Sequence, residues 1–297
     1  MIQAIASNTV RKAQGGAVSA LKDSLQAFGA AVKDTYTPSS VSGETKAAGS
    51  GISTEDMIRQ MGVYCVGNKR PLTREELKQT TALVRNMPAE NLKALYDGKV
   101  KICICDPDSP DIPILKDEKG NEVKDESGKP IKCPPGGWPG GIKMNWAFGA
   151  YYWGARSDDG EKVIAFPKAK LSGLFGMTGD SLAMVHEMGH AIDDLLVPDA
   201  GDTGSNAWNV KNWTNSLSEK DAEELKGICR TSFDKGNWWA KSHLGGPLAD
   251  RAMGEYVANG FMMLYSTPEN RNAVIQNDPG LVAYTRKLES ELKKVKN

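Results

Sequence analysis

The sequence predicts an α+β protein, in which a small sheet lies beside a mainly helical C-terminal half. Two short runs with the alternation of β-strands, Val100–Cys105 and the residues around 150–166, lie in the first part of the chain. From Asp180 onward, capping residues and apolar residues at helical spacing predominate. The 297 residues are 40% hydrophobic and 25% charged, which is ordinary globular usage and enough for one sizeable domain with a smaller lobe.

Residues 1–53 are expected to form a flexible N-terminal segment. Apolar residues at helical spacing favour a short amphipathic helix over 17–32, and the Pro-, Ser-, Gly- and Thr-rich stretch 35–53 is typical of a linker. The first twenty residues lack the apolar core of a secretory signal peptide but are basic and free of acidic residues. Such a start fits either a targeting or non-Sec secretion signal or an ordinary tail, so we expect a secreted or translocated protein, and otherwise a cytoplasmic one.

The region 54–149 is expected to form an N-terminal lobe. Thr73 and Glu76 make a capping box that opens a helix, and Pro88 opens a second one that Gly98 ends. The strand Val100–Cys105 follows, and the polar stretch 114–133 is expected to be a hairpin or surface insertion. No internal repeat is expected anywhere in the chain. The Pro- and Gly-rich run 134–141 is expected to be irregular.

The region 150–297 begins with an expected hairpin, in which Ala150–Arg156 pairs with Lys162–Phe166. Asp180 is expected to cap a helix through Leu196, and Ser218 with Asp221 to open another. Pro247 is expected to open a long helix to about Ser266, and Pro279 the last one.

The run His186-Glu187-Met188-Gly189-His190 is an HExxH pattern. Residues four apart share one face of a helix, so His186 and His190 can bind one metal ion, for which Zn²⁺ is expected. Glu187 lies beside the pair and is the expected general base for an activated water. Two of only three histidines fall in this motif. A surface helix with incidental histidines is the alternative.

A catalytic zinc site needs a third protein ligand and an open position. Glu255 is the best candidate, because it lies in the strongly apolar stretch Met253–Leu264, which predicts a buried helix. An ion pair with Arg251 is the alternative for Glu255. Asn259, one turn further, is expected to orient Glu255. Asp193 and Asp194 are expected either to accept the free N–H of a ligand histidine or to lie on a solvated face.

The runs HEMGHAIDD (186–194) and EYVANGFMMLYS (255–266) resemble the two zinc-binding helices, HEFGHAVDD and EFFAEAFRLMHS, of the lethal-factor-like family of gluzincin metallopeptidases, which includes the Pro-Pro endopeptidases. The resemblance covers residue 150 to the C-terminus. It implies a zincin-like catalytic domain over 54–297, with the zinc-binding core in 150–297. It further implies His186, His190 and Glu255 as ligands, Glu187 as base, and endopeptidase activity on proteins, often in a secreted toxin or effector.

One position departs from that family. The tyrosine that stabilises the oxyanion, seven residues before the third ligand, is replaced here by Leu248. His243 is a candidate for this catalytic role, with Tyr152 and Tyr256 as others, and an ordinary surface histidine is the alternative for His243. The departure also leaves open a catalytically weak or inactive zincin-like binding protein.

Charge, hydropathy and cysteine content narrow the classes of partner and the disulfides that we expect for this chain. Lys plus Arg and Asp plus Glu both number 37, so the basic surplus typical of nucleic-acid binders is missing. No apolar run is long enough to cross a bilayer. Five cysteines do not predict a disulfide framework, although one local disulfide among Cys103, Cys105 and Cys133 stays open beside the favoured reduced thiols. The expected partner is a protein or peptide substrate. The 150–166 hairpin is expected either to bind it along an edge strand or to place its aromatic residues in the core. The oligomeric state stays open.

Overall fold

The computed structural model describes residues 51–66, 68–134, 137–138, 150–152, 162–168, 171, 179–196, 214–242, 244–251 and 253–294. The expected N-terminal helix over 17–32, most of the expected linker and His243 lie outside these residues. In the part of the chain that is described, no helix is long and apolar enough to span a membrane.

The sheet has five strands in the order β2 (Asn68–Pro71), β1 (Gly62–Val66), β3 (Lys101–Cys105), β5 (Val163–Pro167) and β4 (Ala150–Tyr152). The three inner strands run parallel, and the two outer strands pair antiparallel with their neighbours. The expected antiparallel pairing of the 150–156 and 162–166 segments is therefore present, between β4 and β5. Because β3 pairs with β5, the expected lobes 54–149 and 150–297 share one sheet.

Alternation along the inner strands divides the core between the two faces of the sheet. Ile102 and Ile104 of β3, with Ile164 and Phe166 of β5, belong to the main core shared with the helices. The opposite face carries a smaller cluster, in which Cys65, Cys103, Cys105, Val163 and Ala165 are covered by Ile112 and Trp138. All five cysteines are free thiols, so no local disulfide forms.

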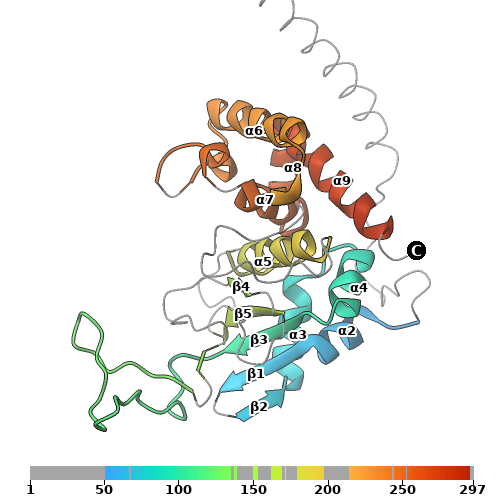
Figure 1. Cartoon of the computed structure of the whole chain (residues 1–297). Helices are drawn as coiled ribbons and strands as arrows, with labels where there is room; N and C mark the ends of the chain where they lie inside the picture. Colours follow the sequence, from blue (N-terminus) through green and yellow to red (C-terminus); the bar gives the residue numbers. More distant parts are fainter. Residues whose placement is uncertain are drawn as a thin grey trace, which may run out of the picture.

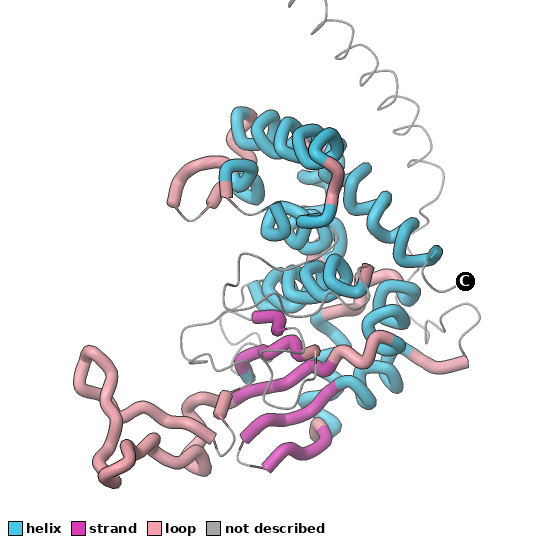
Figure 2. Tube along the Cα trace, viewed as in Figure 1, coloured by secondary structure: helices cyan, strands magenta, loops and turns pink. Residues whose placement is uncertain are grey.

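The described helices are α2 (Thr54–Met61), α3 (Arg74–Leu83), α4 (Ala89–Asp97), α5 (Gly179–Leu195), α6 (Glu219–Asp234), α7 (Met253–Tyr265), α8 (Pro268–Asn277) and α9 (Pro279–Lys294). Figure 1 shows α5 lying above the sheet, with α7 packed on its other side. The helices α6, α8 and α9 surround α7, and Figure 2 shows this separation of a helical half from the sheet. The α+β prediction is confirmed at this level.

The helix starts predicted at Thr73, Pro88, Ser218 and Pro279 are confirmed, whereas α5 begins at Gly179, so Asp180 lies inside that helix and not at its N-cap. Thr73 and Glu76 form the reciprocal capping box of α3, and the Ser218 side chain accepts from the Asp221 amide at the start of α6. The long helix expected from Pro247 is wrong. Leu248–Asp250 form a short 3-10 turn (η6) with Leu248 and Ala249 buried, and the non-helical backbone of Arg251 (φ −135°, ψ −67°) separates it from α7.

Four of the described helices and strands were not predicted: α2, β1, β2 and α8. The strands β1 and β2 are short, and no clear polar alternation marks them in the sequence. The helix α8 has no apolar stripe, since Val274 is its single buried residue. Its position is set by Thr267, whose side chain caps its first turn, and by packing on α7 and α9.

The insertion after β3 contains a short repeat, so the expected absence of repeats is wrong. Leu115, Val123 and Ile131 are eight residues apart, and their amides and carbonyls bond in a closed cycle. The amide of Leu115 donates to Ile131 (2.7 Å), that of Val123 to Leu115 (2.9 Å), and that of Ile131 to Val123 (2.9 Å). Gly120 and Gly128 take equivalent left-handed turns (φ 83° and 80°). Such a short period lies below the 20–50 residues of ordinary repeat architectures.

Candidate metal centre

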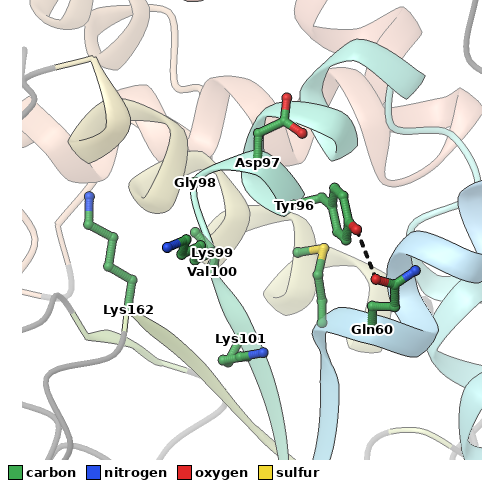
Figure 3. A pocket seen from close by; sticks show the side chains of 9 residues that line it. Gln60, Tyr96, Asp97, Gly98, Lys99, Val100, Lys101 and Lys162 are labelled. Carbon is green, nitrogen blue, oxygen red and sulfur yellow. Dashed lines mark hydrogen bonds between the residues drawn. The ribbon is translucent and has the colours of Figure 1, made fainter. Parts of the chain in front are cut away.

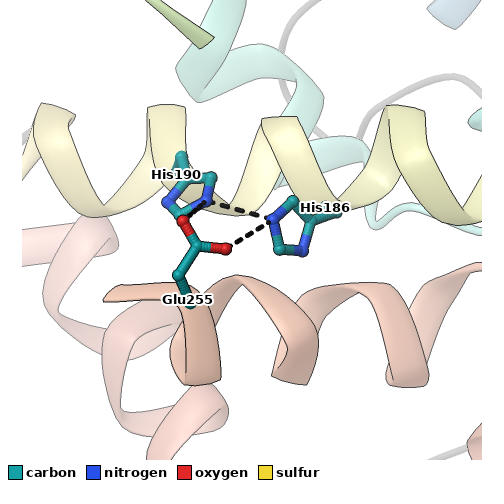
Figure 4. A group of neighbouring side chains, drawn as sticks. All are labelled: His186, His190 and Glu255. Carbon is teal, nitrogen blue, oxygen red and sulfur yellow. Dashed lines mark hydrogen bonds and ion pairs between the residues drawn. The ribbon is translucent and has the colours of Figure 1, made fainter. Parts of the chain in front are cut away.

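The helices α5 and α7 bring His186, His190 and Glu255 together, as Figure 4 shows. The Nε2 atoms of the two imidazoles are 3.1 Å apart. Glu255 Oε2 lies 3.3 Å from His186 Nε2, and its Oε1 lies 3.4 Å from His190 Nε2. Ligands about 2.05 Å from a tetrahedral zinc ion are about 3.3 Å from one another. The three side chains therefore have the spacing of a zinc site without any rearrangement.

Small residues set the distance between the two helices. A Cβ atom on Gly189 would lie 2.9 Å from the Cα of Ala258 and 3.1 Å from the Cβ of Phe261. Any larger side chain at position 189 would push α7 away from α5. Glycine inside the motif therefore permits the close packing that lets Glu255 reach both histidines.

His186 is oriented by Asn259. The Asn259 side-chain amide donates to the carbonyl of Trp239 (2.8 Å), which leaves its Oδ1 facing His186 Nδ1 at 3.0 Å. An oxygen in that place accepts from a protonated Nδ1 and so leaves the lone pair of Nε2 free for a metal. Asn259 was expected to orient Glu255; it contacts His186 on α5 instead.

The cluster is partly exposed to solvent. The side chains of His186 and His190 are 18% and 19% exposed, and that of Glu255 is 43% exposed. Glu255 is therefore less buried than its apolar helix predicted, since it lies in the first turn of α7 at the edge of the core. Its carboxylate contacts the imidazoles, and no ion pair joins the described residues Glu255 and Arg251.

Burial and the contacts within the cluster shift the pKa values of His190 and Glu255 in opposite directions. Burial alone would lower the pKa of His190, but the hydrogen bond and charge of Glu255, with the charge of Glu187, raise it to about 9. Burial favours the neutral form of Glu255, yet its bonds to the two histidines hold its pKa far below its ordinary value. Without a metal the cluster therefore holds a proton, and a divalent cation would take that place.

Glu187 is 9% exposed and directly follows His186 on α5. The alternative that α5 is a surface helix with incidental histidines is wrong, because Val185, Met188 and Ile192 are fully buried. The structure thus places Glu187 in the helix that carries both histidines.

The solvated face considered for Asp193 and Asp194 is also wrong, since they are 1% and 6% exposed. Asp193 Oδ1 accepts from the amide and hydroxyl of Thr214, both at 2.9 Å. Burial is the main reason that the pKa of Asp193 rises to about 6. Asp194 forms an ion pair with Lys162 (2.9 Å). These contacts tie the end of α5 to the 3-10 turn η4 (Thr214–Ser216) and to the residue before β5.

Two of the positions considered for an oxyanion donor, Leu248 and Tyr256, do not supply one. Leu248 is buried and apolar. The hydroxyl of Tyr256 donates to Asp278 Oδ2 at 2.7 Å inside the core, so Tyr256 as an oxyanion donor is wrong. The side chain of Tyr152 and the whole of His243 lie outside the described residues.

A buried carboxylate that was not predicted, Asp278, supports the residues that orient His186. Asp278 Oδ2 accepts from Ser232 (2.5 Å), Trp239 (2.9 Å) and Tyr256 (2.7 Å). Because Trp239 also accepts the bond that orients Asn259, this network holds the support of His186 in place. The only sequence signal was an aspartate just before Pro279, at the start of α9.

No protein-family model and no curated protein matches the chain. Among solved structures, the chain is similar to the Pro-Pro endopeptidase PPEP-2 from Paenibacillus alvei, at 14% identity and a TM-score of 0.43. The match covers 78% of this chain and 99% of that one. A likeness this distant does not assign the fold or the reaction to this chain.

Proposed function

We propose that this chain is a zinc-dependent endopeptidase. One observation carries the proposal: two imidazole nitrogens and a carboxylate from a second helix lie 3.1–3.4 Å apart, at a site that is partly exposed to solvent. Two nitrogens and one oxygen with a free fourth position are the donor set of catalytic zinc, whereas structural zinc is usually closed by four protein ligands.

His186, His190 and Glu255 would hold the ion, with Asn259 fixing the tautomer of His186. Zinc bound there would supply a Lewis acid that acidifies water and polarises a substrate carbonyl. Glu187 would accept the proton of the attacking water and deliver it to the departing amine. Its 9% exposure limits competing solvent.

The sheet offers a place for an extended substrate. β4 is an outer strand that pairs with β5 on one side, and no described strand pairs with its other edge. It also contacts α5. A polypeptide that adds to this edge would lie next to the metal-binding helix, with main-chain bonds giving affinity. We propose a protein substrate on this basis, and a role as a secreted effector in which residues 1–53 serve export.

A catalytically weak or inactive zinc-binding protein is the second candidate. The burial of Leu248 and the bond between Tyr256 and Asp278 favour it, because they remove two positions for an oxyanion donor.

The test compares wild-type protein with Glu187→Gln, both incubated with zinc, in a proteome-wide search for new N-termini. Metal content is measured alongside by elemental analysis. Peptidase activity predicts new termini with wild type only, and one zinc ion bound by each protein. Equal zinc content with no cleavage by either protein selects the inactive binding protein. Failure of both proteins to bind zinc would refute the metal centre itself.

A further inference from the structure

A cavity lies away from the metal cluster, where α4 ends and β3 begins. Its volume is about 630 Å³. Figure 3 shows Lys99, Lys101 and Lys162 around it, with Gln60 and Tyr96 at the side of α2 and α4. None of the metal-cluster residues lines it. A volume of this size is within the range of small-molecule sites.

The lining is cationic. Asp97 is the single acidic residue in the wall, and Lys93 already neutralises it through contacts of 2.8 and 2.9 Å. Lys162 forms an ion pair with Asp194 at the end of α5. No ion pair links Lys99 or Lys101 to an acid within the described ranges. Two ammonium groups are therefore left to attract an anion.

Lys99 occupies a backbone position that favours glycine. It has a left-handed backbone (φ 58°) and is the one non-glycine residue with positive φ in the described chain. The amide of Val100 donates to Leu95 and that of Lys99 to Tyr96, both at 3.0 Å, which is the Schellman pattern at a helix C-terminus. Glycine is usual there because a side chain costs free energy in this conformation. A lysine that is kept at such a cost points to a use of its side chain.

The other end of the cavity suits an uncharged group. The hydroxyl of Tyr96 donates to Gln60 Oε1 (2.8 Å), which fixes the two side chains against each other. Met61 and Val100 add buried apolar surface to the same lining. An inorganic ion would leave this part of the cavity empty.

We propose that this cavity is a binding site for a small organic anion, with a phosphate or carboxylate near Lys99 and Lys101 and a planar or apolar body against Tyr96 and Met61. Lysine ammonium groups bind phosphate and carboxylate as point charges. The inference is independent of the proposed peptidase activity.

Binding of phenyl phosphate, benzoate and inorganic phosphate to the full chain is measured by calorimetry. We expect phenyl phosphate to bind at least tenfold more tightly than inorganic phosphate, with benzoate showing whether a carboxylate suffices. Equal affinities of phenyl phosphate and inorganic phosphate would overturn an organic ligand. No saturable binding of phenyl phosphate or of benzoate would overturn the site.

Variants locate the binding. Lys99→Gly should weaken phenyl phosphate binding about fivefold, the effect of one unit charge at about 4 Å in water, while it raises the melting temperature by relieving the left-handed backbone. Lys101→Ala should also weaken binding, Lys99→Arg should retain it, and Lys226→Ala on α6 is the control for loss of a distant lysine. Unchanged affinity in both Lys99→Gly and Lys101→Ala would refute the assignment.

Discussion

Replacing Gly189 by alanine tests whether helix spacing sets the metal site. The added Cβ would lie 2.9 Å from the Ala258 Cα and 3.1 Å from Phe261, where ordinary contacts are 3.4–4 Å. Because one of these atoms belongs to the backbone, α7 has to move by roughly 0.5–1 Å to restore such contacts. That shift would lengthen the Glu255 contacts of 3.3 and 3.4 Å beyond the spacing of zinc ligands.

We expect Gly189→Ala to lose at least tenfold in zinc affinity, measured by competition with a chromophoric chelator. Overpacking should cost about 1–3 kcal/mol of unfolding free energy, offset in part by the better helix propensity of alanine, worth about 1 kcal/mol. Gly227→Ala is the matched control, because Gly227 lies in α6 with nothing within 4 Å of an added Cβ. It should be neutral or stabilising and keep full zinc affinity. Wild-type zinc affinity in Gly189→Ala would refute the reasoning.

Three further changes test other parts of the structure. Asn259→Ala should weaken zinc binding about 10–100-fold, as the loss of a partner that orients a ligand histidine does, and Asn259→Asp should weaken it less, because a carboxylate still accepts from His186 but cannot donate to the Trp239 carbonyl; equal affinities in all three proteins would contradict the role of Asn259. Asp278→Ala should destabilise the fold by about 3 kcal/mol or more in urea unfolding, because three buried donors lose their acceptor, and a loss below about 1 kcal/mol would contradict this. Burial alone would raise the pKa of Glu76, but Arg70 and the Thr73 cap lower it from 4.5 to about 2. A carboxylate whose pKa is lowered by folding stabilises the protein above pH 4.5, and this contribution is lost as the pH falls toward 2. Up to about 3 kcal/mol of unfolding free energy should therefore be lost across that window, and Glu76→Gln should flatten this pH dependence. The same acid dependence in both proteins would exclude Glu76 as its source.

The sequence alone determined the features that arise within one element. The capping residues of α3 and α6 were readable because a cap and its partner are three residues apart. His186 and His190 were placed on one face of α5 by the helical period, and Glu255 was singled out as a carboxylate in an apolar helix.

Only the tertiary structure decided which side chains of different helices contact one another. Asn259 contacts His186 and not Glu255, and Tyr256 turns into the core toward Asp278. Spacing along a helix cannot predict either contact, because it does not specify how α7 is rotated and placed against α5 and α9. That placement depends on close packing, above all at Gly189 and Gly260, where an added Cβ would meet atoms of the neighbouring helix at 2.9 and 2.4 Å.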